Sequence, residues 1–207
     1  MYISIYFKVE MLKAPQQERS ERTLQRILDV CEDLIGGGRF EQVSMNEIAT
    51  QSGVSVGTLY KRFDSKSAII EYLVEQLQTQ QYDRMVQELA ECKETSFSAR
   101  FRFLSMLIYR SCDEYNGLLR TVMAAHLSGT SPLSGTTNTR SVGLIDALAT
   151  WLSESPGSPD FKACREAVAI VSFAYQYRAI YPTPDALLGA DVYQSAVYEM
   201  ALNYLGG

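Results

Sequence analysis

The chain has 207 residues, of which 46% are hydrophobic and 21% charged, as in a folded globular protein of one or two domains. No apolar run approaches the roughly 18 residues of a membrane helix. Residues 1–7 are apolar, but we do not expect them to act as a signal peptide. The four cysteines are scattered without a C-x-x-C pair, which excludes a disulfide scaffold and a zinc ribbon and predicts reduced thiols in the cytoplasm.

The net charge of −5 does not by itself indicate a nucleic-acid-binding protein, but it is unevenly distributed. Residues 1–67 carry nine basic and nine acidic side chains, whereas residues 68–207 carry ten basic and fifteen acidic ones. Contact with a polyanion is therefore expected from the first third of the chain, through a local basic cluster.

The first predicted helix includes residues 24–35, where apolar residues recur at i, i+3, i+4 and i+7. A run of three glycines stops this helix. Ser44 and Glu47 then have the spacing of a capping box, in which each residue satisfies an exposed backbone donor of the other. A second helix is predicted to begin there.

The second helix is predicted to be short, because Ser52-Gly53 interrupts it. A glycine in the left-handed conformation ends one helix and lets the next leave at a steep angle. Ser55 offers the next N-cap, and a third short helix is expected over residues 56–62. Asp64-Ser65 caps a longer fourth helix that runs to about residue 92. Helices two and three thus form a helix-turn-helix, whose second helix reads DNA.

The rest of the chain also has a helical period, without strand-like alternation or internal repeats. Further helices are predicted at about 97–112, 114–127, 139–152, 161–180 and 191–205. The sequence therefore predicts an all-α fold of about nine helices, with a three-helix helix-turn-helix head and a C-terminal helical bundle.

The helix-turn-helix resembles the N-terminal signature of the TetR family of transcriptional regulators over about residues 20–75. The residues that carry the resemblance are Ile48-Ala49, Gly53-Val54-Ser55, Gly57-Thr58-Leu59-Tyr60, Phe63 and Ser65-Lys66. In that family the head binds DNA as a homodimer, and the body binds a small molecule that releases the DNA. The resemblance therefore implies an N-terminal extension (1–12), a DNA-binding domain (13–67) and a ligand-binding and dimerisation domain (68–207).

The resemblance also implies which residues contact DNA. Val56 and Gly57 are expected to face base edges, and Thr58 and Tyr60 to offer hydroxyl groups to phosphates. Lys66, at the positive end of the fourth helix, is the expected phosphate anchor. The whole expected set is Ser44, Ser55, Val56, Gly57, Thr58, Tyr60, Lys61, Arg62 and Lys66.

Three further features concern this DNA-binding surface. Arg62 replaces the aromatic residue or histidine common in the family, yet a guanidinium still binds phosphate through two parallel hydrogen bonds. Gly57 lies in the first turn of a helix, where glycine costs up to about 1 kcal/mol relative to alanine, which favours the approach of a bulky partner. Lys13, Arg19 and Arg22 are interpreted as a solvated face, with a DNA contact as the alternative.

Residues 53–57 also match G-x-S-x-G, the nucleophile motif of hydrolases. That chemistry requires a preceding strand and a partner histidine, whereas here a helix precedes and the only histidine is His126. We interpret Ser55 as a helix cap and expect no enzyme. One histidine cannot supply the two Glu-x-x-His pairs of a di-iron bundle, and no cofactor motif is present, so neither a metal site nor a cofactor is expected.

The body is rich in aromatic residues, most of which are expected to pack in the core or in a dimer interface. A pocket between helices is also expected to use some of them, which predicts a mostly apolar or aromatic ligand. His126 is interpreted first as a core histidine. The candidate ligand-binding residues are Tyr109, Met123, His126, Trp151, Phe173 and Tyr177.

The last two long helices carry small and apolar residues suited to close packing with a second copy, and the resemblance implies that they form the dimer interface. The sequence thus predicts a cytoplasmic, homodimeric repressor without a membrane partner. It would bind a pseudo-palindromic double-stranded operator and be released by a small molecule. The alternative is a DNA-binding or protein-interaction module of the same fold without a small-molecule inducer.

Overall fold

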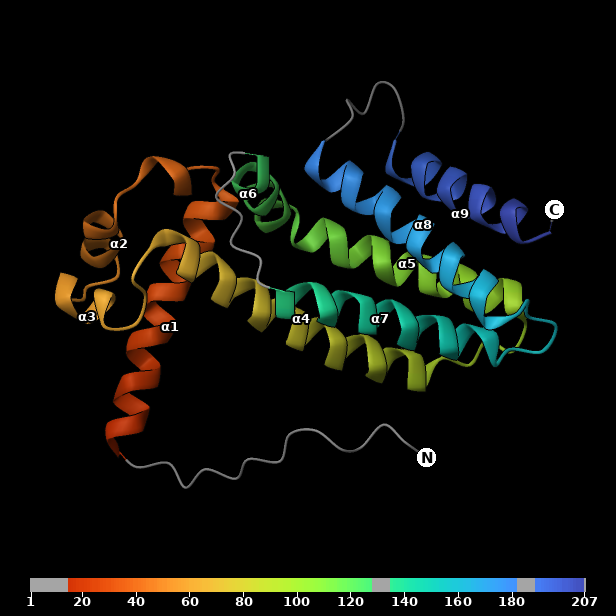
Figure 1. Ribbon diagram of the computed structural model, residues 1–207, viewed down its shortest axis with the longest axis horizontal. Helices are drawn as coiled ribbons and strands as arrows, with labels where there is room; N and C mark the ends of the chain where they lie inside the picture. Colours follow the sequence, from red (N-terminus) through yellow and green to blue (C-terminus); the bar gives the residue numbers. More distant parts are fainter. Residues whose placement is uncertain (1–14, 128–134, 182–188, 207) are drawn as a thin grey trace.

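The computed structural model describes residues 15–127, 135–181 and 189–206 (Figure 1). Within these ranges the chain forms nine α-helices and one short 3-10 helix, with no strand. The prediction of an all-α fold of about nine helices is confirmed. The elements are α1 (Pro15–Gly36), η1 (Phe40–Gln42), α2 (Met45–Gln51), α3 (Val56–Tyr60), α4 (Lys66–Glu91), α5 (Phe97–Glu114), α6 (Asn116–Leu127), α7 (Gly135–Ser153), α8 (Phe161–Ile180) and α9 (Ala190–Gly206). The predicted extension, residues 1–12, lies outside the described residues.

The observed boundaries differ from the predicted ones mainly at α1, α3 and α7, and α7 begins at Gly135 instead of the predicted residue 139. Helix α1 begins at Pro15, well before the first apolar repeat at Leu24, because its first turns project beyond the core and need no apolar face. Proline is favoured at the first position of a helix, since that position needs no amide donor. Helix α3 ends at Tyr60, and Lys61 is already its C-cap.

The first four helices form the head of the molecule, at the left of Figure 1. They enclose one hydrophobic cluster, to which α1, α2, α3 and α4 contribute the fully buried Ile27, Ile48, Leu59 and Ile69. Because Ala49 is also fully buried and small, α2 can pack closely on its neighbours. The short helices α2 and α3 are thereby held by the hydrophobic core that they share with α1 and α4.

The second half of α4 and helices α5, α7, α8 and α9 enclose a separate hydrophobic cluster. Together with α6, which packs on α8, they form the body. Helix α8 packs against α5, α6, α7 and α9. Its buried face carries the small residues Cys164, Ala167, Val168 and Val171, which allow neighbouring helices to approach. None of the described helices is long and apolar enough to cross a membrane.

Head and body meet along α4 and at the start of α6. Leu118 and Val122 of α6 pack against the head cluster. A Cβ added to Gly117 would lie 3.4 Å from the carbonyl oxygen of Ile35, so the glycine permits close approach of α6 to the end of α1. Arg120 then links α6 to α8 through a 3.0 Å hydrogen bond from Nε to the carbonyl oxygen of Ala179.

Candidate nucleic-acid interface

The helix-turn-helix begins with the capping box that the sequence predicts. The side chain of Glu47 accepts a 2.7 Å hydrogen bond from the amide of Ser44 and a 2.8 Å one from its hydroxyl. The hydroxyl oxygen of Ser44 in turn accepts from the Glu47 amide at 3.3 Å. These bonds from the backbone and the hydroxyl of Ser44 favour the ionised form and hold the pKa of Glu47 below its ordinary value. Both residues are exposed at the start of α2.

The turn between α2 and α3 is built from Ser52 and Gly53. The buried Ser52 hydroxyl donates a 2.7 Å hydrogen bond to the carbonyl oxygen of Ile48, one turn earlier. Gly53 has a φ of +64°, the left-handed region that strongly favours glycine. A Cβ at this position would lie 3.6 Å from a guanidinium nitrogen of Arg26, which places Arg26 of α1 beside the turn.

Helix α3 has one buried and one outward face. Ser55 caps it by accepting a 3.1 Å hydrogen bond from the amide of Thr58, and the two hydroxyl oxygens lie 2.7 Å apart. Leu59 is fully buried, whereas Val56 is 39% and Tyr60 49% exposed. These exposed apolar and aromatic side chains are therefore available to a partner outside the chain.

Gly57 lies on the same exposed part of α3. A Cβ added there would have no atom of the described chain within 4 Å, apart from those of its own helix backbone and neighbours, so packing inside the protein does not require a glycine. Glycine nevertheless lowers helix stability relative to alanine. The position is therefore suited to close approach by an external partner.

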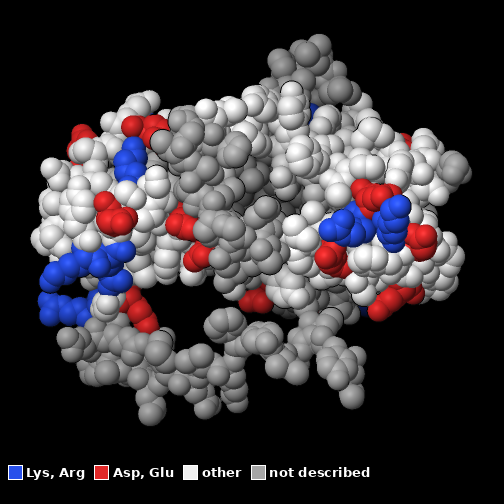
Figure 2. All heavy atoms as spheres, viewed as in Figure 1, with Lys and Arg blue, Asp and Glu red and all other residues white. Residues whose placement is uncertain are grey.

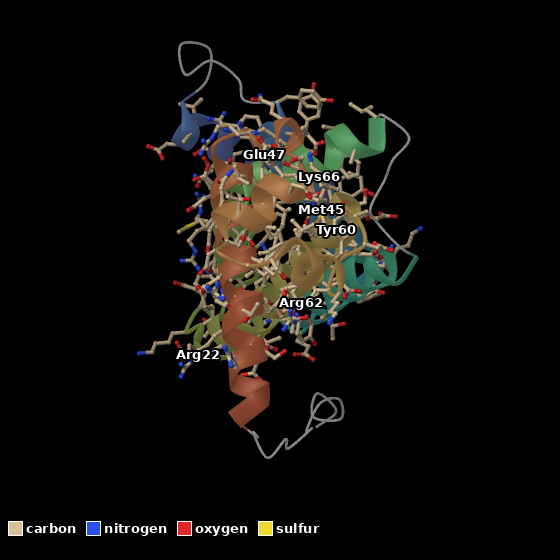
Figure 3. All side chains as sticks on the ribbon, turned by 90° about the vertical axis from the view of Figure 1, so that its left-hand side faces the viewer. Arg22, Met45, Glu47, Tyr60, Arg62 and Lys66 are labelled. Atoms are coloured by element: carbon tan, nitrogen blue, oxygen red, sulfur yellow. The ribbon has the colours of Figure 1, made fainter. Side chains whose placement is uncertain are left out.

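Two basic residues of the predicted set, Lys66 and Arg62, already have partners within the head. The Lys66 ammonium lies 3.6 Å from a carboxylate oxygen of Glu41 and 4.9 Å from the centre of the Phe40 ring. Arg62 donates hydrogen bonds to α1, to the carbonyl oxygen of Ser20 at 2.6 Å and to its hydroxyl oxygen at 2.5 Å. Figure 3 shows Arg62 next to α1, with Tyr60 and Lys66 above it.

The structure thus brings the expected DNA-binding residues to one end of the molecule, on α3 and at the starts of α2 and α4. The analysis of the sequence missed Arg26 and Ser20 of α1. A signal for Arg26 was present, since Arg19, Arg22 and Arg26 recur at i, i+3 and i+7 and so share one helical face, on which all three are exposed. Ser20 had no such local signal, because its partner Arg62 is 42 residues away in the chain. Figure 2 shows lysine and arginine side chains gathered at this end, beside α1 and α3.

The candidate ligand-binding residues occupy different environments in the body. Tyr109 packs edge-on against the buried Tyr175, with ring centres 5.2 Å apart. The ring of Trp151 lies beneath the guanidinium of Arg100, 4.9 Å away, and Met123 is half-buried in α6. Phe173 and Tyr177, by contrast, are 78% and 61% exposed on α8.

The side chain of His126 lies outside the described part of the structure. The ligand-binding set stays a prediction. Among the described residues, no group of three or more His, Cys, Asp and Glu side chains is arranged to hold a metal ion.

Residues 27–73 match the family model of bacterial regulatory proteins, tetR family. The resemblance of the head to the TetR family is confirmed. An HTH-type transcriptional regulator of Staphylococcus aureus (strain USA300) is 37% identical to this chain over 51 residues. That match covers 25% of this chain and only 28% of the length of the relative.

Solved structures extend the likeness of fold to the body. FadR from Bacillus subtilis, solved in complex with stearoyl-CoA, has a TM-score of 0.59 at 16% identity, over 87% of this chain and 98% of FadR. A protein of Syntrophomonas wolfei described as a TetR-family transcriptional regulator has a TM-score of 0.65 at 18% identity, over 91% and 97% of the two chains. The chain therefore shares the fold of these two regulators over about nine tenths of its length.

Proposed function

We propose that the protein is a homodimeric DNA-binding transcriptional regulator, and most simply a cytoplasmic repressor. The observation that carries this proposal is the outward face of α3, a short helix fixed by caps and core that presents Val56, Gly57 and Tyr60 to the exterior. A rigid helix with an exposed face of this kind fits the major groove of DNA. We place the boundary between DNA-binding and ligand-binding parts at about residue 67.

In this proposal, α3 enters the major groove, with Val56 against a thymine methyl group and Gly57 against the edge of a base. Thr58 and Tyr60 donate hydroxyl hydrogens to phosphates beside the groove. Lys66 binds a phosphate at the start of α4, where the helix dipole also favours an anion. Its nearest carboxylate, that of Glu41, is exposed, so the ammonium can exchange that partner for phosphate.

The proposed dimer interface is the outer surface of α8 and α9. Exposed apolar and aromatic side chains lie along both of these neighbouring helices. On α8, Phe173 and Tyr177 are four residues apart, and on α9, Met200 and Tyr204 are four residues apart, with Val192 eight residues before Met200. A monomer exposes such large apolar side chains at a free-energy cost, which pairing with a second copy removes. A two-fold dimer would then place its two α3 helices one helical turn of DNA apart, roughly 34 Å.

For the effector we propose a small, mostly apolar or aromatic molecule that binds in the body. The support is the fold shared with FadR, solved with stearoyl-CoA, and the aromatic interior around Tyr109 and Tyr175. A ligand can release DNA only if it binds the two conformational states with different affinity. The alternative is a regulator without an inducer. It is favoured by the exposure of Phe173 and Tyr177, because two of the candidate ligand-binding residues then face the exterior and not the interior of the body.

Selection of binding sites from a random DNA library tests the proposal. We expect an enriched duplex with two inverted half-sites, and footprinting that protects two successive major grooves on one face of the helix. Enrichment of no sequence, or of a single half-site, would contradict the proposed dimeric regulator. The selected duplex can then be used to screen small molecules that release it.

A further inference from the structure

Arg62 makes a contact in the head that joins elements far apart in the sequence. Its guanidinium nitrogen Nη2 donates to both the carbonyl and the hydroxyl oxygen of Ser20, 42 residues earlier in the chain. Ser20 lies one turn before Leu24, the first of the described α1 side chains to pack against the head cluster. The contact therefore holds a part of α1 that lies beyond the hydrophobic core.

The same part of α1 carries a basic face. Arg19, Arg22 and Arg26 are exposed and share one side of the helix, and Arg26 reaches the turn at Gly53. In Figure 3, Arg22 lies to the left of α1 and Arg62 to its right, so the two guanidinium groups flank this helix. In a chain with a net charge of −5, this is a local concentration of positive charge beside the reading helix.

We propose that Arg62 is a positioning residue, which fixes α1 against α3 so that Arg19 and Arg22 bind backbone phosphates beside the groove that α3 enters. This inference rests on the proposed DNA-binding function. A helix end held in its binding orientation loses less conformational freedom when DNA binds, so its arginines contribute more affinity. Arg62 itself is engaged with two oxygen atoms of Ser20, and a phosphate would have to compete with them.

A comparison of single and combined variants separates this role from a direct phosphate contact. Arg62→Ala, the pair Arg19→Ala with Arg22→Ala, and the triple variant are titrated with the duplex selected by the wild-type protein. The slope of log affinity against log salt is negative, and each lost phosphate contact reduces its magnitude by about 0.9. We expect Arg62→Ala to reduce the magnitude of this slope by about 2, because the phosphate contacts of both Arg19 and Arg22 are lost. Binding should weaken about tenfold at 0.1 M salt.

In the background that lacks Arg19 and Arg22, Arg62→Ala should change neither the slope nor the affinity by more than about a factor of two, because residues that act together are non-additive. If Arg62 itself contacts a phosphate, Arg62→Ala should instead reduce the magnitude of the slope further, by about 0.9, in that background. That additive result would overturn the inference.

Ser20→Ala gives a second test that does not depend on the folding of Arg62→Ala. It retains the guanidinium and removes one of its two acceptors, and alanine is the best helix former. We expect binding to weaken about two- to threefold, an effect that disappears once Arg19 and Arg22 are alanines. Unchanged binding by Ser20→Ala, or the same loss in both backgrounds, would overturn the inference.

Arg102→Ala in α5 is the matched control for loss of one surface charge, since Arg102 is exposed in the body, where its guanidinium lies 3.9 Å from Glu199 and 4.2 Å from the centre of the Tyr198 ring. It should leave the salt slope unchanged. If the wild-type protein selects no DNA sequence, the proposed function and this inference both fail. If the wild-type protein binds its selected duplex and the variants are additive, only the inference fails.

Discussion

The head and the body of this protein each enclose one hydrophobic cluster between helices, but their outer surfaces differ. The head exposes hydroxyl groups, arginines and, on α3, the glycine Gly57, whereas the body exposes large apolar side chains on α8 and α9. A polar and basic surface fits a hydrated polyanion, and an apolar helical face fits another apolar face. In the proposed function this difference corresponds to two different partners, DNA for the head and a second copy for the body.

The largest expected effect comes from placing charge on the apolar surface of the body. Phe173→Glu combined with Met200→Glu should convert the dimer to a monomer, because the carboxylates would be buried without partners. Operator affinity should fall about a thousandfold with the loss of the second head. Sedimentation and DNA titration measure the two effects.

The matched control for that pair is Met106→Glu, at an exposed methionine of α5. This control should remain dimeric. A double variant that remains dimeric would show that the interface lies elsewhere in the body.

The next effect tests whether the two cores are separate. Ile48→Ala leaves a cavity in the head core and should lower the free energy of unfolding by about 3 kcal/mol. Trp151, the only tryptophan, lies in the body and reports on the unfolding of the body. In Ile48→Ala, the unfolding midpoint measured by its fluorescence should therefore decrease less than the midpoint measured by circular dichroism. Leu152→Ala, in the body core, should shift both signals. Equal shifts of both signals in Ile48→Ala would show that head and body unfold as one cooperative unit.

A smaller effect is expected at the DNA-contacting face. Tyr60→Ala together with Lys66→Ala should weaken operator binding about thirtyfold, near 2 kcal/mol, through loss of phosphate contacts. Tyr82→Ala with Lys162→Ala removes the same residue types from exposed positions of the body and should have no effect. Retained affinity in the Tyr60 and Lys66 double variant would exclude this face as the reader of DNA.

The smallest expected effect concerns the capping box and pH. Because the folded-state pKa of Glu47 is lowered, its charge stabilises the head above the unfolded-state pKa, near 4.5. That contribution is lost as the pH falls through the lower folded-state value. Glu47→Gln keeps the side-chain hydrogen bond but not the charge. The variant should therefore be less stable than the wild-type protein at pH 7, and the difference should shrink below pH 4.5. A difference that is constant with pH would contradict the role of the charge.

The sequence predicted the head more completely than the body, for a physical reason. The caps at Ser44 and Ser55 and the left-handed Gly53 act over three or four residues, so their spacing along the chain already describes their geometry. The residues on the outward face of α3 were implied by the resemblance to the TetR family. The contact of Arg62 with Ser20 spans 42 residues, and no local pattern indicates it.

In the body, helix positions were predictable but the environment of individual aromatic residues was not. Phe173 and Tyr175 are two residues apart and both aromatic, yet the more apolar Phe173 is 78% exposed, whereas Tyr175 is buried with its hydroxyl 2.7 Å from that of Ser105. Which side of α8 faces α5 depends on how five helices pack together. For this reason a ligand-binding set could not be derived from residue type alone.

The most direct test of the account is binding of the purified protein to duplex DNA from upstream of its own gene, against a scrambled duplex, over a salt series. We predict tight binding to the first duplex, with a steep decrease in affinity as salt rises, and at least a thousandfold preference over the second at about 0.15 M salt. Weak and equal binding to both duplexes at every salt concentration would contradict the claim that the head reads DNA.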